Sequence, residues 1–312
     1  MLRQTLLYLS SQPQVAQFVR HNPLAKRFAD RFVAGESLEQ ALDAVVDLNS
    51  KGISASLDVL GESVHSEDEA RAAGREYLHL LDRIHERGLD ANVSVKLTAM
   101  GLDVSEDLCV TIVHEVLARA RDYRTFVRLD MESSAYTDRT LRLFYDRFYP
   151  AYPEHVGIVL QSYLYRTGTD VASAIAARAR VRLCKGAYKE SSAVAFPAKR
   201  DVDANYDRCM RQLMSEGNYP GVATHDERLI REAKRFATDQ GIAVNRFEFQ
   251  MLYGVRRDLQ SALVRDGYRV RVYVPFGTQW YPYLMRRLAE RPANVVFIAG
   301  NVFREAIRRN HA

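Results

Sequence analysis

The chain has 312 residues, of which 47% are hydrophobic and 27% charged, which is an ordinary globular composition. Its formal net charge is +5 with the lysines and arginines scattered, a pattern that suits an anionic substrate or a membrane surface at least as well as nucleic acid. Only three cysteines occur, without a CxxC pair, so a disulfide scaffold and a cysteine-based zinc site are disfavoured and a reducing compartment is indicated.

The amino-terminal part is predicted to be helical up to about Asn49. Its first residues, MLRQTLLYLSSQPQ, lack the apolar core and cleavage site of a secretory signal, and no run of about 18 apolar residues predicts a membrane span. The serine and arginine content is poor for a transit peptide. A cytoplasmic location is therefore favoured over the mitochondrial matrix.

After residue 50 one pattern repeats: a short apolar run, turn residues and an amphipathic helix. The runs are ISASLDVL (53–60), NVSVKLTAM (92–100), FVRLDM (126–131), VGIVLQSYL (156–164), RVRLCKG (180–186), GVATH (221–225), FEFQML (247–252) and RVRVYVPFG (269–277). Eight strand–helix units of about 25–40 residues each match a (β/α)8 barrel. Because no antiparallel tail follows, a closed barrel is favoured over a doubly wound open sheet.

Several intervening helices are marked at their ends. One is predicted over residues 66–88, with a capping box formed by Ser66 and Glu69 and with Gly88 at its end. The longest loop, residues 186–201, is a candidate flap over an active site.

The stretch YPYLMRRLAE (281–290) is predicted to be a last helix that opens on Pro282. Periodicity alone suits a solvated face in which Arg286 pairs with Glu290. The helix follows the eighth strand after a short loop, however, so we expect it to cover the barrel mouth.

No linker or low-complexity segment interrupts the chain. We therefore expect a single structural domain, in which a helical segment (1–50) packs on a catalytic barrel (51–312).

Charged and polar side chains lie at the carboxyl ends of several predicted strands, where (β/α)8-barrel enzymes carry their catalytic groups. These residues are Lys96, Asp130, Glu132, Arg182, Lys185, Thr224, His225 and Tyr273. One interpretation is a structural ion-pair network that fills the barrel, because buried charges need partners. The cations outnumber the acids, which favours an anionic substrate or cofactor.

Other chemistries stay open from the residues alone. No metal is predicted, because HxH and HExxH motifs are absent. A Schiff base on Lys96 or Lys185 would make the protein a lyase or aldolase. Asp130 and Glu132, two apart on one strand face, could be the acid and base of a glycosidase. A non-catalytic ligand-binding barrel also remains, but no clustered basic stripe supports nucleic acid as its partner.

Taken in order, the strand-end motifs resemble the proline dehydrogenase family of flavin enzymes. The matching stretches are SLDVLGE, VSVKL, LDME, VLQSYL, VRLCKGAY, ATH, FEFQMLYG, VRVYVPFG and YLMRRLAE. The resemblance implies a distorted (β/α)8 barrel with non-covalently bound FAD. It also implies oxidation of L-proline to Δ1-pyrroline-5-carboxylate, by hydride transfer from C5 of proline to N5 of FAD.

The resemblance implies roles for individual residues. Asp130 and Arg182 are expected in the catalytic centre, and Arg286 and Arg287 on the substrate carboxylate. The other expected substrate-binding residues are Lys96, Tyr188, Leu252, Tyr273 and Tyr283. The expected FAD contacts are Met131, Gln161, Lys185, Gly186, Ala187, Thr224 and His225.

Small departures from the commonest family pattern, such as LDMES and Cys184, remove none of these groups. Family members that prefer hydroxyproline carry a smaller residue where Tyr283 stands, so proline is the expected substrate. The resemblance further implies a membrane quinone as electron acceptor and peripheral association with the inner face of the membrane. The length of the chain predicts a monofunctional enzyme whose product passes to a separate pyrroline-5-carboxylate dehydrogenase.

Overall fold

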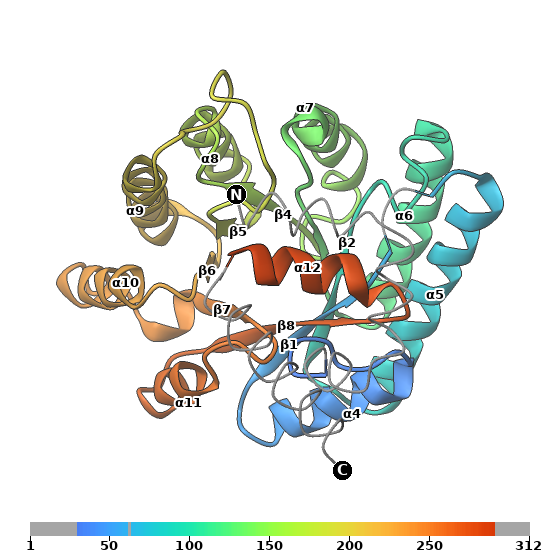
Figure 1. Cartoon of the computed structure of the whole chain (residues 1–312), viewed down its shortest axis with the longest axis horizontal. Helices are drawn as coiled ribbons and strands as arrows, with labels where there is room; N and C mark the ends of the chain where they lie inside the picture. Colours follow the sequence, from blue (N-terminus) through green and yellow to red (C-terminus); the bar gives the residue numbers. More distant parts are fainter. Residues whose placement is uncertain (1–29, 62–63, 291–312) are drawn as a thin grey trace, which may run out of the picture.

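A computed structural model describes residues 30–61 and 64–290. Within them, eight parallel strands close into a barrel in the order β1-β2-β3-β4-β5-β6-β7-β8, with helices around it (Figure 1). Each strand pairs with its neighbours in sequence, and β1 pairs with β8 to complete the closure. The predicted (β/α)8 barrel is therefore confirmed, and the open sheet is excluded.

The strands coincide with the predicted apolar runs. They are β1 (Ser54–Val59), β2 (Ala91–Val95), β3 (Val127–Leu129), β4 (Val156–Gln161), β5 (Arg180–Cys184), β6 (Gly221–Ala223), β7 (Glu248–Leu252) and β8 (Val270–Phe276). Several are shorter than predicted at their carboxyl ends. Beyond β2, for example, the chain turns back through a bond from Leu102 N to Leu97 O at 3.0 Å. Lys96, Asp130 and His225 therefore lie on loops just after their strands, whereas Arg182 and Tyr273 lie within β5 and β8.

The helices pack around the barrel, apart from the last one that the structure describes, α12, which lies across its mouth (Figure 1). They are α4 (Leu38–Asn49), α5 (Glu67–Glu86), α6 (Glu106–Asp122), α7 (Ser134–Leu143), α8 (Thr167–Ala176), α9 (Lys199–Glu216), α10 (Glu227–Asp239), α11 (Arg257–Arg265) and α12 (Trp280–Glu290). A π-helical turn (Phe144–Phe148) follows α7, and a 3-10 turn (Val244–Arg246) precedes β7. Among the helices that the structure describes, none combines the length and the apolar character needed to cross a membrane.

Capping residues explain where α5 begins and ends. Ser66 Oγ accepts a hydrogen bond from Glu69 N at 3.2 Å, as predicted. The Glu69 carboxylate, however, accepts from His65 N at 2.7 Å, so the reciprocal half of the predicted capping box is wrong. The helix ends at its cap, Arg87, and Gly88 follows with φ +60°, which glycine adopts without strain.

The amino-terminal segment is described only from residue 30. There α4 buries Ala41, Leu42 and Val45 in the core that surrounds the barrel. The predicted helices before residue 30 lie outside the described residues. The division into segments 1–50 and 51–312 therefore stays a prediction.

The barrel interior is polar, although most (β/α)8 barrels fill it with branched apolar side chains. Outward-facing strand residues pack apolar side chains against the helices, so β2 and β4 are buried at every position. The buried polar or charged residues of the strands include Ser56, Asp58, Ser94, Arg128, Arg182, Glu248 and Gln250. Such groups need hydrogen-bond partners, and the site below is built from them.

Helix α12 crosses the mouth of the barrel (Figure 1), as expected. It begins at Trp280, two residues before the predicted start, and Trp280 Nε1 donates to Glu36 at 2.9 Å. Pro282 fits there because the first turn of a helix needs no backbone N–H from it. Tyr283, 6% exposed, is buried, so its side of the helix is not a solvated face. The side chains of residues 286–290 lie outside the described part of the chain.

Candidate active site

Asp130, directly after β3, brings two other predicted site residues together. Its Oδ1 accepts from Arg182 Nη1 at 2.8 Å, and its Oδ2 accepts from Tyr273 OH at 2.7 Å. Burial, and then the charge of Asp130, raises the pKa of Tyr273 well above its ordinary value, so the phenol keeps its proton and donates. The Arg182 guanidinium carbon also lies 5.3 Å from the Tyr273 ring centroid. These three residues form one fixed unit.

Neutral side chains hold the rest of Arg182. Its Nη1 donates to Ser94 Oγ at 3.1 Å, its Nη2 to Ser56 Oγ at 3.2 Å, and its Nε to Gln250 Oε1. The residue is 6% exposed, so its guanidinium is buried with a single orientation. Sequence reasoning missed all three partners. Each lies two positions before a strand-end residue on an inward-facing row, and strand alternation was the signal for them.

Lys96, after β2, is paired with Asp58 of β1. Its Nζ lies 2.8 and 2.9 Å from the two carboxylate oxygens, and the residues are 8% and 1% exposed. Burial raises the pKa of Asp58, and the charge of Lys96 opposes that rise. Asp58 was also missed, although SLDVLGE carries it at the end of the first strand. A Schiff base needs an unprotonated amine, which this ion pair disfavours.

Glu132 does not join Asp130 as a second catalytic acid. It is 5% exposed and accepts hydrogen bonds from Thr98 Oγ1 at 2.6 Å and Thr98 N at 3.2 Å. Because β3 ends at Leu129, the two-residue alternation that placed both acids on one face no longer applies. The glycosidase interpretation therefore loses its basis, and Glu132 instead ties together the loops after β2 and β3.

Gln161, the last residue of β4, leaves a buried polar atom unsatisfied. Its Nε2 donates to Met131 O at 3.3 Å, whereas its Oε1 is buried and has no hydrogen-bond partner among the described residues. An unsatisfied buried acceptor costs about 1–3 kcal/mol. A ligand that donates a hydrogen bond beside Met131 would remove that cost.

The chain after β5 makes a close approach at Gly186. Its φ is +109°, and a Cβ there would lie 2.4 Å from the Tyr163 ring, so only glycine fits. The loop beyond it is anchored by Glu190, which accepts from Ser134 N at 2.8 Å and Tyr163 OH at 3.2 Å. The predicted flap is a loop only up to residue 198, because α9 begins at Lys199.

Lys185 belongs to a charged cluster at the ends of β5 and β6. Its Nζ lies 2.6 Å from Asp203 Oδ1 and 3.0 Å from Asp226 Oδ2. Lys199 and Arg228 also pair with Asp203, at 2.5 and 3.1 Å. Burial alone would raise the pKa of both carboxyls, but a hydrogen bond from Lys185, joined at Asp203 by one from Lys199, lowers it. Three cations against two carboxylates leave the cluster net positive.

The residues after β6 contact β7. His225 Nε2 accepts a hydrogen bond from Leu252 N at 2.9 Å, so that nitrogen carries no proton. Thr224, 6% exposed, accepts from Asp226 N through Oγ1 at 3.1 Å. These bonds fix both predicted cofactor contacts at the barrel mouth.

Four other predicted site residues lie on the loop after β5 and on α12. Ala187 is exposed and Tyr188 half-buried on the loop after β5. Arg286 and Arg287 lie on α12, but their side chains are outside the described residues.

Comparison with known proteins identifies the family of this chain. The sequence matches the family model described as proline dehydrogenase over residues 41–300. The chain belongs to the proline dehydrogenase family. It is 45% identical over 299 residues to a proline dehydrogenase of Deinococcus radiodurans, covering 95% of this chain and 96% of the relative. It is 40% identical over 305 residues to proline dehydrogenase 1 of Bacillus subtilis (strain 168), covering 98% and 100%.

A solved structure has the same barrel. It is that of proline utilization A from Bdellovibrio bacteriovorus inactivated by N-propargylglycine, with a TM-score of 0.79 and 28% sequence identity. The match covers 85% of this chain and 32% of that protein, so the chain spans about a third of its length. The predicted family and the predicted class, an oxidoreductase, are confirmed.

The proline dehydrogenase family implies a flavin cofactor, and three features of this chain fit one. The first is the unsatisfied oxygen of buried Gln161. The second is the close-packed backbone at Gly186, where no side chain can intrude. The third is the net positive cluster around Lys185, which suits the diphosphate of a dinucleotide.

Proposed function

We propose that this chain oxidises L-proline to Δ1-pyrroline-5-carboxylate with non-covalently bound FAD. The observation that carries the proposal is the Asp130–Arg182–Tyr273 network at the barrel mouth of a proline dehydrogenase family member. When bound, the flavin supplies at N5 the acceptor for the hydride that leaves C5 of proline. The chain's own residues bind the substrate, orient it and stabilise charge.

Arg182 is proposed as the catalytic cation. Its guanidinium is already fixed by Asp130, Ser56 and Ser94, so it needs no reorganisation as negative charge develops beside it. Asp130 accepts two hydrogen bonds and therefore acts by holding Arg182 and Tyr273 in place.

We further propose that Arg286 and Arg287 bind the proline carboxylate. Helix α12 crosses the barrel mouth (Figure 1), which supports a clamp on the side facing the network. Two arginines bind a carboxylate through charge-assisted, bidentate hydrogen bonds. The remaining proposed walls of the proline pocket are Lys96, Tyr188, Leu252, Tyr273 and Tyr283.

The proposed FAD contacts come from four strand ends and one loop. They are Met131, Gln161, Lys185, Gly186, Ala187, Thr224 and His225. Buried Met131 and Gln161 would contact the ring system, and the net positive Lys185 cluster would contact the diphosphate. We also propose a membrane quinone as the electron acceptor, reached by peripheral association, and a separate pyrroline-5-carboxylate dehydrogenase that uses the product.

A spectroscopic experiment tests the function. The purified chain, reconstituted with FAD, should be yellow, and L-proline added without oxygen should bleach the flavin absorption. Glycine is the matched control, because it carries the same carboxylate but no ring C5 from which hydride could leave. A protein that takes up no FAD, or whose flavin L-proline does not reduce, would refute the proposal.

Substituting lysine for the arginines of α12 tests the clamp. Arg286→Lys and Arg287→Lys should each raise KM for proline about tenfold or more, because lysine cannot reproduce a bidentate fork. Steady-state kinetics measure the effect, and Arg265→Lys, an exposed arginine on α11, serves as the control. Unchanged KM values in both α12 variants would contradict the carboxylate assignment.

A further inference from the structure

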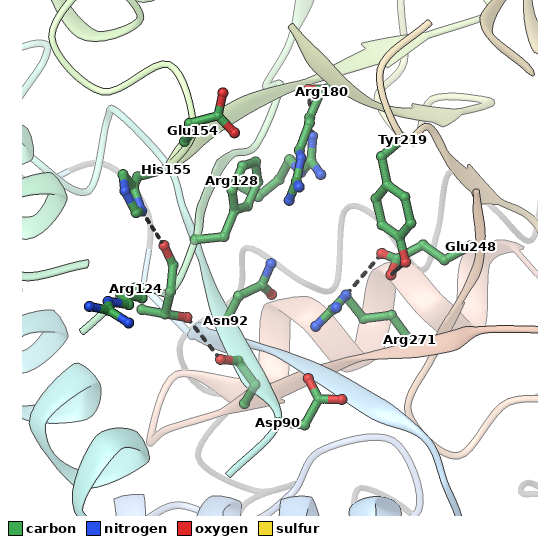
Figure 2. A pocket seen from close by; sticks show the side chains of 13 residues that line it. Asp90, Asn92, Arg124, Arg128, Glu154, His155, Arg180, Tyr219, Glu248 and Arg271 are labelled. Carbon is green, nitrogen blue, oxygen red and sulfur yellow. Dashed lines mark hydrogen bonds and ion pairs between the residues drawn. The ribbon is translucent and has the colours of Figure 1, made fainter. Parts of the chain in front are cut away.

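A polar cavity lies at the end of the barrel opposite the candidate active site, where the strands begin. Its volume is about 240 Å³, and Figure 2 shows its lining. Five polar or charged side chains of the lining come from β2, β3, β5, β7 and β8. They are Asn92, Arg128, Arg180, Glu248 and Arg271. The proposed reaction, at the carboxyl ends of the strands, uses none of them.

One ion pair in this cavity is complete. Arg271 Nε donates to Glu248 Oε1 at 2.9 Å, and its Nη1 donates to Ala55 O at 2.8 Å. Glu248 Oε2 accepts from Tyr219 OH at 3.2 Å. Burial by itself would raise the pKa of Glu248, but the charge and hydrogen bond of Arg271 lower it. This carboxylate is therefore ionised and already paired (Figure 2).

Among the described residues, Arg128 and Arg180 have no such partner. Arg128 is 3% exposed, and its Nη1 donates only to carbonyl groups, Arg180 O at 2.7 Å and Ile158 O at 3.2 Å. The Nε atoms of both arginines are buried and unpaired within the described part of the chain. Neither arginine lies within ion-pair distance of a carboxylate of the described residues. Burial, and then the charge of Arg182, lowers the pKa of Arg128 well below its ordinary value.

Aromatic rings partly compensate for the missing anions. The guanidinium carbons of Arg128 and Arg180 lie 4.8 and 5.1 Å from the Phe126 ring centroid. Arg180 also lies 5.3 Å from the Tyr219 ring centroid, and Figure 2 shows it between Arg128 and Tyr219. Such contacts hold the two cations close together, although they repel each other.

Two further features favour a ligand in the cavity: space beside a glycine and an unsatisfied polar side chain. Gly157 makes space for Arg128, since a Cβ there would lie 2.6 Å from its Nη1. The buried Asn92 Oδ1 has no hydrogen-bond partner among the described residues, and an amide that turns over can present its NH2 group instead. Two unpaired cations and an unsatisfied amide therefore border the same cavity.

We propose that this cavity binds a small oxoanion between Arg128 and Arg180. Planar guanidinium groups match the oxygen pairs of phosphate and carboxylate, and an anion offsets the cost of burying the charge of Arg128 beside the half-buried Arg180. A structural network would pair both arginines with acids, as Arg271 is paired with Glu248. The volume of about 240 Å³ has room for a small molecule.

Calorimetric titration of the FAD-loaded chain tests the proposal. Inorganic phosphate and succinate are titrated separately at constant ionic strength, so that the two sources of oxoanion are distinguished. We expect saturable binding of at least one anion, weakened about tenfold or more in Arg180→Gln because a charge-assisted contact is lost. Binding of unchanged affinity in this variant would place the anion at the barrel mouth, where the proposed carboxylate clamp lies, and would overturn the proposal.

Arg246→Gln is the matched control, since Arg246 is exposed and lies just before β7, near the same barrel end but outside the cavity lining. It should bind the anion as the unchanged chain does. Arg180→Lys keeps the charge and supplies the comparison if the glutamine variant does not fold. Absence of saturable binding for both anions, or equal affinities in the Arg180 variants and the unchanged chain, would overturn the proposal. Equal weakening by Arg246→Gln would overturn it too.

Discussion

Replacing Asp130 by asparagine is expected to lower kcat/KM for proline about 100-fold, because a preorganised site loses the charge that fixes Arg182. The variant keeps the shape of the side chain but removes the charge that Arg182 Nη1 contacts at 2.8 Å. Its NH2 group would also face either the Arg182 guanidinium, which can only donate, or the Tyr273 hydroxyl, which would then have to accept instead of donate. The group that it faces should therefore leave its fixed position.

Steady-state kinetics and the flavin absorbance per protein measure this effect together. Asp47→Asn is the control, because the Asp47 side chain is 64% exposed and pairs with Lys51 on the surface. Full activity in Asp130→Asn would contradict the assignment. Activity lost only in proportion to lost flavin would also contradict it, because Asp130 is proposed to orient Arg182 rather than to bind the cofactor.

Replacing Asp58 by asparagine is expected to lower the free energy of unfolding by about 3–5 kcal/mol, because a buried lysine is left without its counter-charge. Lys96 Nζ contacts both Asp58 oxygens at 2.8 and 2.9 Å, and the two side chains are 10% and 1% exposed. No other strand-end ion pair of the site is as deeply buried among the pairs described. The effect is read from urea unfolding of the flavin-free chain at neutral pH.

A double-variant cycle separates the pair from a general loss of packing. Lys96→Met and the double variant Asp58→Asn/Lys96→Met complete it, and we expect the double variant to be more stable than the sum of the single changes predicts. Additive losses would mean that the ion pair contributes nothing of its own. A loss of less than about 1 kcal/mol in Asp58→Asn would place the pair with weak surface salt bridges instead.

Much of the fold follows from local patterns. Short apolar runs alternating with amphipathic helices predicted all eight strands and the closed barrel, because side-chain periodicity reports which faces are buried. Strand ends were less accurate, as at β3, which ends at Leu129 rather than residue 131. Because the strand ends before it, Glu132 does not share a strand face with Asp130, as the alternation along an extended strand had predicted.

The site was predicted only in part. Asp130, Arg182 and Tyr273 carry charge or a hydroxyl at strand ends, so they could be found without knowing their neighbours. For Ser56 and Gln250, strand alternation indicates only that they face the barrel interior, and it does not tell that they bind a guanidinium. Ser56 lies 126 positions from Arg182, and only closure of β1 against β8 brings such residues within reach.

The sequence by itself determined the barrel, the family resemblance and the residue types at the mouth, because periodicity and motifs are local properties. The tertiary structure decided which of these residues meet. It paired Lys96 with Asp58 and held Arg182 between Asp130 and three neutral side chains. At the other end it left the Nε atoms of Arg128 and Arg180 without a partner among the described residues. The physical reason is that the cost of a buried charge depends on its neighbours in space, and those come from strands far apart in the chain.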